Sequence, residues 1–111
     1  MSTLKNKVQL IGHVGQTPEI KKFENGNKMA RFSLATNDVY VNGKGEKIEQ
    51  TYWHNLVAWG KTAELIENYV DKGKQIAIDG KLVNRSYETD KGEKRFITEV
   101  LVNEVLFFNK N

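Results

Sequence analysis

Apolar and polar residues alternate along most of this chain with a period of two, which is the repeat typical of β-strands. In the first such segment, Val8, Leu10 and Val14 share one face of the predicted strand. Gly12 interrupts the pattern and indicates a bend of the kind that a barrel corner needs. We expect a strand in each of five segments: residues 7–15, 29–37, 51–59, 75–87 and 95–108.

The segments between these strands are rich in turn residues. Residues 19–23 are expected to form a short ribbon that ends in a hairpin turn at Asn25-Gly26. Residues 41–50 are polar and contain glycine, which predicts a long, mobile hairpin loop. A further turn is predicted at residues 90–92, before the last strand.

One segment, residues 61–72, has helical spacing instead. Its apolar positions fall on one side of a helix: Ala63, Leu65, Ile66, Tyr69 and Val70. Thr62 is expected to cap the N-terminus of this helix, and Gly73 is expected to end it.

The predicted order is therefore three strands, one helix and two strands. This order is typical of the OB fold, an all-β, five-stranded, partly open Greek-key barrel with one helix between the third and fourth strands. A chain of 111 residues is long enough for one hydrophobic core and too short for two ordinary domains. We expect a single OB-fold domain over residues 1–111.

The composition of the chain excludes some classes of function but does not identify one. The formal net charge of +3 permits a nucleic-acid partner but does not require one. There are no cysteines, and the two histidines lie in no metal-binding or catalytic spacing, so neither an enzyme nor a metal or cofactor site is expected. No apolar run approaches the ~20 residues that span a bilayer, and no signal peptide follows Met1, so a cytoplasmic location is expected.

Exposed aromatic side chains are the main candidates for binding. Trp53 and Trp59 share one face of the third strand, either outside the barrel or in its core, and alternation alone does not decide between the two. On the fourth strand, Ile76, Ile78 and Leu82 are expected to point inward. Tyr87 is then exposed beside Lys81 and Arg85, and Tyr40 lies at the entrance to the polar loop, either exposed or half-buried at the strand end.

This combination of rings and cations suits a single strand of nucleic acid. Bases stack on aromatic rings with roughly 1–3 kcal/mol each, independently of sequence, while cations contact the phosphates. The candidate stacking residues are Tyr40, Trp53, Trp59 and Tyr87, and the candidate phosphate-binding residues are Lys61, Lys72, Lys81, Arg85, Lys94 and Arg95.

A series of motifs along the chain resembles the bacterial single-stranded DNA-binding protein family. The matching stretches are Asn6–Gly12, Gly15–Glu19, Met29–Thr36, Thr51–Lys61 (TYWHNLVAWGK), Ala63–Leu65, Tyr69–Gly73, Ile78–Leu82 and Thr98–Asn103. They cover nearly the whole chain in order. No single motif is specific to this family, but the series of motifs taken together is.

The resemblance implies an OB-fold protomer that assembles as a homotetramer wrapped by single-stranded DNA. It implies aromatic stacking at the four positions given above, and it places His54 at a subunit interface. Asn55 stands where the family commonly has a basic residue, which puts one phosphate contact in doubt. The family's flexible linker and acidic C-terminal tail are not expected after residue 111, so recruitment of replication and repair enzymes is in doubt.

The predicted function is sequence-independent binding and protection of single-stranded DNA in replication, recombination and repair, in association with the nucleoid. Two alternatives remain open at this point. A tail-less OB protein can act as a dimeric primosome accessory protein, for which the oligomeric state is the discriminating measurement. An OB module of the cold-shock type would instead prefer RNA to DNA.

Overall fold

The computed structural model describes residues 5–108. The chain ends, residues 1–4 and 109–111, which the sequence analysis considered for a leader and a tail, lie outside the described residues. The elements in chain order are β1 (Val8–Val14), β2 (Glu19–Lys22), β3 (Lys28–Val41), β4 (Lys47–Trp59), α1 (Gly60–Tyr69), β5 (Gln75–Glu88) and β6 (Lys94–Phe107).

Five of the strands close into a barrel. Their order is β1-β5-β6-β4-β3, and pairing of β1 with β3 closes the circle. The β4–β6 pair is parallel, with Leu56 beside Val100, and the other barrel pairs are antiparallel. Strand β2 pairs only with β3, as a short ribbon outside the barrel. The predicted OB fold, with the helix between the third and fourth barrel strands, is confirmed.

The hydrophobic core fills the barrel and continues under α1. Its buried side chains are Val14, Ala30, Phe32, Leu34, Leu56, Ala58, Ala63, Ile66, Val70, Ile76, Ile78, Val100 and Val102. Ala63 and Ile66 are the buried residues of the helix, on the side that packs on the barrel strands. Inward residues of the strands therefore recur at every second position, as the sequence pattern predicted.

The helix is shorter than predicted and lacks the predicted cap. It spans Gly60–Tyr69, and the residue at its N-cap position is Trp59, which makes no side-chain capping hydrogen bond. Thr62 is therefore inside the helix. The amide of Val70 donates to the carbonyl of Ile66, which closes the last turn. No helix within residues 5–108 is long and apolar enough to cross a membrane.

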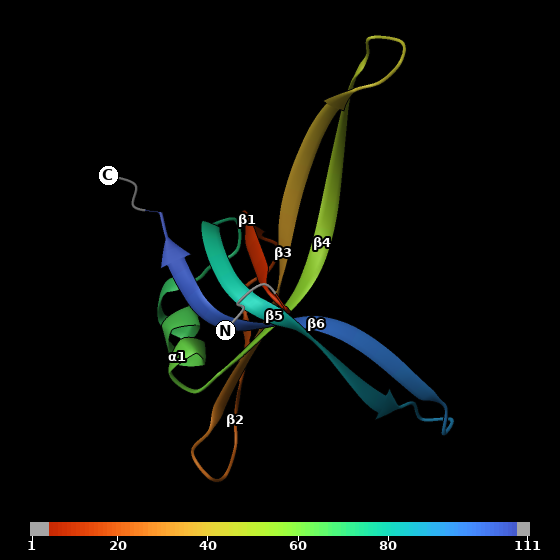
Figure 1. Cartoon of the computed structure of the whole chain (residues 1–111). Helices are drawn as coiled ribbons and strands as arrows, with labels where there is room; N and C mark the ends of the chain where they lie inside the picture. The colour runs from red at the N-terminus through yellow and green to blue at the C-terminus, as the bar shows by residue number, and fades with distance from the viewer. Residues whose placement is uncertain (1–4, 109–111) are drawn as a thin grey trace.

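Three hairpin arms radiate from the barrel: β2–β3, β3–β4 and β5–β6 (Figure 1). Their tips share one hydrogen-bond pattern, in Phe23–Asn27, Asn42–Glu46 and Thr89–Glu93. In each tip the first amide donates to the last carbonyl, and a glycine amide donates to the first carbonyl. That glycine has a φ of 80–90°, a region that a Cβ disfavours. The three tips are thus built as three-residue loops with glycine in the left-handed position.

The β3–β4 arm corrects the prediction of a long loop at residues 41–50. Strand β3 continues to Val41 and β4 begins at Lys47, so only the tip between them is a turn. The side-chain oxygen of Asn42 accepts two backbone amides in this turn, at 2.9 and 3.0 Å. The arm has two solvent-facing sides. It therefore lacks the alternation that reveals a half-buried strand.

Gly12 lies where β1 changes partners. Strand β1 pairs with β5 from Val8 to His13, and His13 also begins its pairing with β3. A Cβ on Gly12 would lie 2.1 Å from the carbonyl oxygen of Ala35 on β3. Glycine is required because the two backbones meet here to close the barrel.

Leu82 was predicted inside the barrel and is instead 50% exposed. Its side chain points to the same side of β5 as those of Ile76 and Ile78, which are buried. However, β5 continues past the barrel into the β5–β6 arm, so an inward-facing position there meets solvent. Leu82 is opposite Val100, the core residue of β6 nearest this arm, so the barrel ends at this pair.

Candidate nucleic-acid interface

Both tryptophans lie on the outer face of β4. Trp53 is 62% exposed and Trp59 is 46% exposed, while Leu56 and Ala58 on the other face are fully buried. The interpretation that places the tryptophans in the core is therefore wrong. Val57 lies on the same face between them and is buried.

The ring of Trp53 covers Gly15. A Cβ on Gly15 would lie 2.3 Å from the Cζ3 atom of the indole. The absence of a side chain at residue 15 therefore leaves the space that the ring occupies. One side of Trp53 rests on the chain just after β1, and the exposed remainder of the ring is available to a ligand.

Trp59 belongs to an aromatic stack that the sequence analysis missed. The ring of Phe23, at the tip of the β2–β3 arm, is stacked on Trp59 with centroids 5.7 Å apart and an interplanar angle of 19°. The ammonium of Lys21 lies 5.6 Å from the centroid of Phe23. The signal in the sequence was the alternation of Lys21 and Phe23 in the short ribbon. Nothing in it indicated that the ribbon folds back toward the end of β4.

Tyr87 and Arg85 lie together on the outer face of β5. The guanidinium carbon of Arg85 is 5.9 Å from the centroid of the Tyr87 ring, which is exposed. Arg85 is not a free cation, however. Its Nε and Nη2 donate to the two carboxylate oxygens of Glu99 at 3.0 and 3.3 Å, and this hydrogen bonding raises the pKa of Arg85. A cation held in this way has fewer hydrogen atoms to offer to a phosphate than we expected from the sequence.

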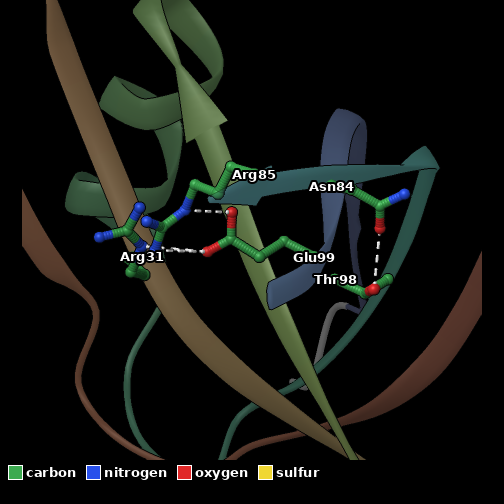
Figure 2. Close-up of polar contacts among 5 residues, drawn as sticks. All are labelled: Arg31, Asn84, Arg85, Thr98 and Glu99. Atoms are coloured by element: carbon green, nitrogen blue, oxygen red, sulfur yellow. Dashed lines mark hydrogen bonds and ion pairs between the residues drawn. The ribbon is translucent and has the colours of Figure 1, made fainter. Parts of the chain in front are cut away.

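Glu99 is the buried charged residue of this surface. It is 3% exposed and also lies 3.4 Å from the Nε atom of Arg31 on β3 (Figure 2). Next to it along the same two strands, Thr98 donates a 2.8 Å hydrogen bond to Asn84, on the opposite face of the β5–β6 ribbon. Nothing in the sequence pattern singled out Glu99 as a buried residue.

Tyr40 is exposed, but it is not on the face that carries the tryptophans. Trp53 is opposite Ala35 in the β3–β4 register, and Tyr40 is opposite Ile48. Residues directly opposite share a face, and faces alternate along each strand. Because an odd number of positions separates Ala35 from Tyr40, the tyrosine lies on the other side of the β3–β4 arm.

The candidate phosphate-binding cations fall into two groups. Lys81 and Arg95 share the outer face of the β5–β6 ribbon with Tyr87, and Arg95 forms an exposed ion pair with Glu93 at 3.0 Å. Lys94 lies on the opposite face of that ribbon.

The other group flanks the helix. Lys61 is in its first turn and Lys72 follows its end, and both are exposed. These two lysines therefore come from a different element of the fold than the cations of the β5–β6 ribbon.

His54 is half-buried where the β3–β4 arm leaves the barrel. Its Nε2 atom is 3.0 Å from the hydroxyl oxygen of Thr36, so the ring has a hydrogen-bond partner within the chain. Its role at a subunit interface stays a prediction. Among residues 5–108, no group of three or more acidic or histidine side chains is arranged to hold a metal ion.

The chain is similar to proteins named for binding single-stranded DNA. Single-stranded DNA-binding protein 1 of Chlorobaculum tepidum is 40% identical over 101 residues, which cover 90% of this chain and 62% of that protein. The single-stranded DNA-binding protein of Bacteroides thetaiotaomicron is 45% identical over 102 residues, which cover 90% of this chain and 63% of that protein. The chain thus spans less than two thirds of the length of these relatives.

Solved structures match the fold closely. An SSB of Plasmodium falciparum in complex with single-stranded DNA superposes with a TM-score of 0.86 at 32% identity, over 98% of this chain and 99% of that one. A deletion mutant of the single-stranded DNA-binding protein from Thermus aquaticus gives a TM-score of 0.78 at 28% identity, over 90% of this chain and 48% of that one. The sequence also matches the family described as "Single-strand binding protein family" over residues 5–108. This chain belongs to the single-strand binding protein family.

Proposed function

We propose that this chain binds single-stranded DNA independently of sequence, by stacking bases on aromatic side chains and holding phosphates with lysine and arginine. The observation that carries the proposal is the exposure of two indoles, Trp53 and Trp59, on one face of β4. Large exposed rings are costly in water unless a ligand covers them. Every base has a face that can stack on such a ring, so the binding needs no particular sequence.

Tyr87 extends this surface onto the β5–β6 arm. It shares its face with Lys81 and Arg95, so bases and phosphates of one strand find partners side by side. Tyr40 lies on the other side of the β3–β4 arm. A strand that stacks on both Tyr40 and Trp53 therefore has to pass around the edge of that arm. Such a path favours wrapping of the DNA around the protein over binding in a straight groove.

The biological role that fits this activity is protection of single-stranded DNA in replication, recombination and repair, with the protein located at the nucleoid. The function requires no chemical step, cofactor or metal. It is supported by the names of the two bacterial relatives and by the Plasmodium falciparum structure, which contains single-stranded DNA.

Assembly as a homo-oligomer, with the homotetramer as the specific proposal, is supported by an apolar patch away from the tryptophans. Ile11 on β1 is 59% exposed and Leu106 on β6 is 65% exposed. Both line a groove over β1, β5 and β6, together with Gln9, Leu10, Ala77, Ile78, Asp79 and Glu104. Apolar patches of this kind mark protein interfaces. We further propose that His54 lies near a second interface in the tetramer.

Tryptophan fluorescence tests the proposed DNA binding directly, because Trp53 and Trp59 are the two tryptophans of the chain. We expect saturable quenching by poly-dT that weakens as salt rises, since phosphate contacts release counterions. A duplex hides its base faces, so a duplex competitor should bind far more weakly. Equal competition by duplex, or an unchanged emission with poly-dT, would contradict the proposal. Tighter binding of poly-U than of poly-dT would favour an RNA-binding role instead.

A further inference from the structure

The buried carboxylate of Glu99 joins two arginines that come from different strands of the molecule. Arg85 extends from β5 and Arg31 from β3, and the two guanidinium groups meet at the same carboxylate on β6 (Figure 2). A buried carboxylate needs cationic partners, because removing it from water is costly. Arg85 alone supplies the cationic partner that the Glu99 carboxylate needs. The second arginine therefore calls for a separate explanation.

The two arginines are held unequally. Arg85 makes a two-pronged contact, with its Nε 3.0 Å from Oε1 and its Nη2 3.3 Å from Oε2 of Glu99. Arg31 reaches Oε2 only through an ion pair at 3.4 Å, and within the described residues its buried Nε has no hydrogen-bond partner. About a third of the Arg31 side chain remains exposed, at 36%. Arg31 therefore keeps most of its donors available for another anion.

The position of Arg31 indicates which anion that is. In the β3–β4 register Arg31 is opposite Val57, which lies between Trp53 and Trp59 on the outer face of β4. A strand rises about 3.3 Å per residue, so the two tryptophans are roughly 20 Å apart along β4. A single strand whose bases lie on both rings has to carry its backbone past Arg31.

We propose that Arg31, Glu99 and Arg85 form a clamp for one backbone phosphate of single-stranded DNA, and that Glu99 is its positioning residue. The clamp has two positive charges and one negative charge, so it offers one net positive charge to one phosphate. Glu99 holds both guanidinium groups in place before the DNA arrives, which lowers the entropic cost of binding. Through Arg85 it also holds the cation beside the ring of Tyr87. This inference rests on the proposed DNA binding and adds Arg31 and Glu99 to it.

The sign of the effect of Glu99→Gln separates positioning from simple neutralisation. If Glu99 only cancels charge, its removal makes the surface more positive and binding of an oligo-dT becomes tighter. If Glu99 positions the arginines, binding becomes several-fold weaker in spite of the added positive charge. We expect the weaker binding.

Arg31→Met tests the phosphate contact itself. For single strands, each phosphate contact contributes about 0.7 to the slope of log K against log salt. We expect Arg31→Met to make this slope less negative by about 0.7 and to weaken binding several-fold at moderate salt. An oligo-dT with uncharged methylphosphonate linkages has no phosphate charge for Arg31 to contact, so wild type and Arg31→Met should bind it equally. If Arg31 had a purely structural role, the variant would bind this strand more weakly as well.

Lys28→Met is the matched control. Lys28 is also on β3 and also pairs with a glutamate, Glu67 of α1, at 2.6 Å, but it lies on the other face of the strand. We expect it to leave both the affinity and the salt slope unchanged. Thermal unfolding of each variant checks that it is folded. If Glu99→Gln fails to fold, the partly exposed Arg31→Met carries the test alone.

The outcomes distinguish this inference from the function on which it rests. If wild type fails to bind oligo-dT, the proposed DNA binding fails. If wild type binds and Arg31→Met keeps the wild-type slope, or Glu99→Gln binds more tightly, the clamp is refuted while the DNA binding stands. A loss of affinity that persists with the methylphosphonate strand also refutes the clamp.

Discussion

The indole of Trp59 is stacked on the phenyl ring of Phe23, with the ring centroids 5.7 Å apart and the planes inclined by 19°. Phe23 belongs to the tip of the β2–β3 arm, and Trp59 is the last residue of β4. One face of the indole is thus covered by a side chain from the β2–β3 arm. This contact restricts the orientation of the Trp59 ring before any base stacks on it.

Replacing Trp59 with alanine should weaken binding of oligo-dT by about 1–3 kcal/mol, the range for one stacked base. The fold should survive, because Trp59 is on the outer face of the barrel. Phe23→Ala should weaken binding less, since it removes the support and leaves the ring. Titrations by fluorescence anisotropy with a labelled oligo-dT, together with thermal unfolding, measure both effects. A Trp59→Ala variant that is folded and binds with wild-type affinity would remove Trp59 from the interface.

Gly15→Ala should weaken DNA binding with little loss of stability. The new Cβ would lie 2.3 Å from Cζ3 of Trp53 and 2.8 Å from Oγ of Ser33, so the exposed ring has to move away and the hydroxyl group has to rotate. Gly12→Ala is the contrasting variant, because its Cβ would lie 2.1 Å from a backbone oxygen of β3 that cannot move freely. That change should cost about 1–3 kcal/mol or more of stability. Urea unfolding and oligo-dT titration of both variants separate the two effects, and equal destabilisation by both would contradict the expectation.

Tyr87→Ala should weaken binding by about 1–3 kcal/mol, whereas Tyr87→Phe should bind nearly as well as wild type. The reason is that a base stacks on the ring and does not need the hydroxyl group. Both variants leave the contact between Arg85 and Glu99 in place. Isothermal titration with oligo-dT checks the pair. A large loss in Tyr87→Phe would mean that the hydroxyl group makes the important contact.

Leu106→Glu should weaken self-association, because it places a charge in the middle of the apolar patch over β1, β5 and β6. Leu106 is 65% exposed in the protomer, so the variant should remain folded. Sedimentation velocity over a range of concentrations measures the change in mass. Ile11→Glu should act in the same way. Leu65→Glu is the control, since Leu65 is an exposed leucine on α1, away from the patch. If both patch variants form the same oligomer as wild type, the subunit interface does not lie at this patch.

The barrel itself could be predicted from the sequence. Residues that alternate between inside and outside leave a period of two in the chain, and the helix leaves a period near 3.6. Both periods were present, and they led to the five barrel strands, the helix between β4 and β5, and the inward direction of Ile76 and Ile78, while the choice between the two faces of β4 stayed open. These patterns are local, so they need no knowledge of which strands are neighbours.

The arms could not be predicted in the same way. Beyond the barrel both faces of a ribbon meet solvent, and the alternation fades or becomes misleading. This is why residues 41–50 were predicted as a loop, and why Leu82 was predicted as buried. Neither error could be corrected without knowing where the barrel ends and each arm begins.

The outward-facing tryptophans were identified by the sequence as a pair, but their environment depends on tertiary structure. The pairing of Phe23 with Trp59 and of Gly15 with Trp53 brings together residues that are far apart in the chain. Such contacts leave no periodic signal. The same holds for Tyr40, whose placement across the arm from Trp53 follows from the strand register.

Glu99 shows most clearly what only the tertiary structure decided. In the sequence it is a glutamate between Thr98 and Val100, on the opposite side of the strand from Val100, which normally means an exposed charge. In the structure it is 3% exposed and lies between Arg31 and Arg85. The sequence by itself determined the strands, the helix and the outward direction of these side chains, because each depends on local alternation. The burial of Glu99 depends on the closure of the barrel, which brings β3, β5 and β6 together around one carboxylate.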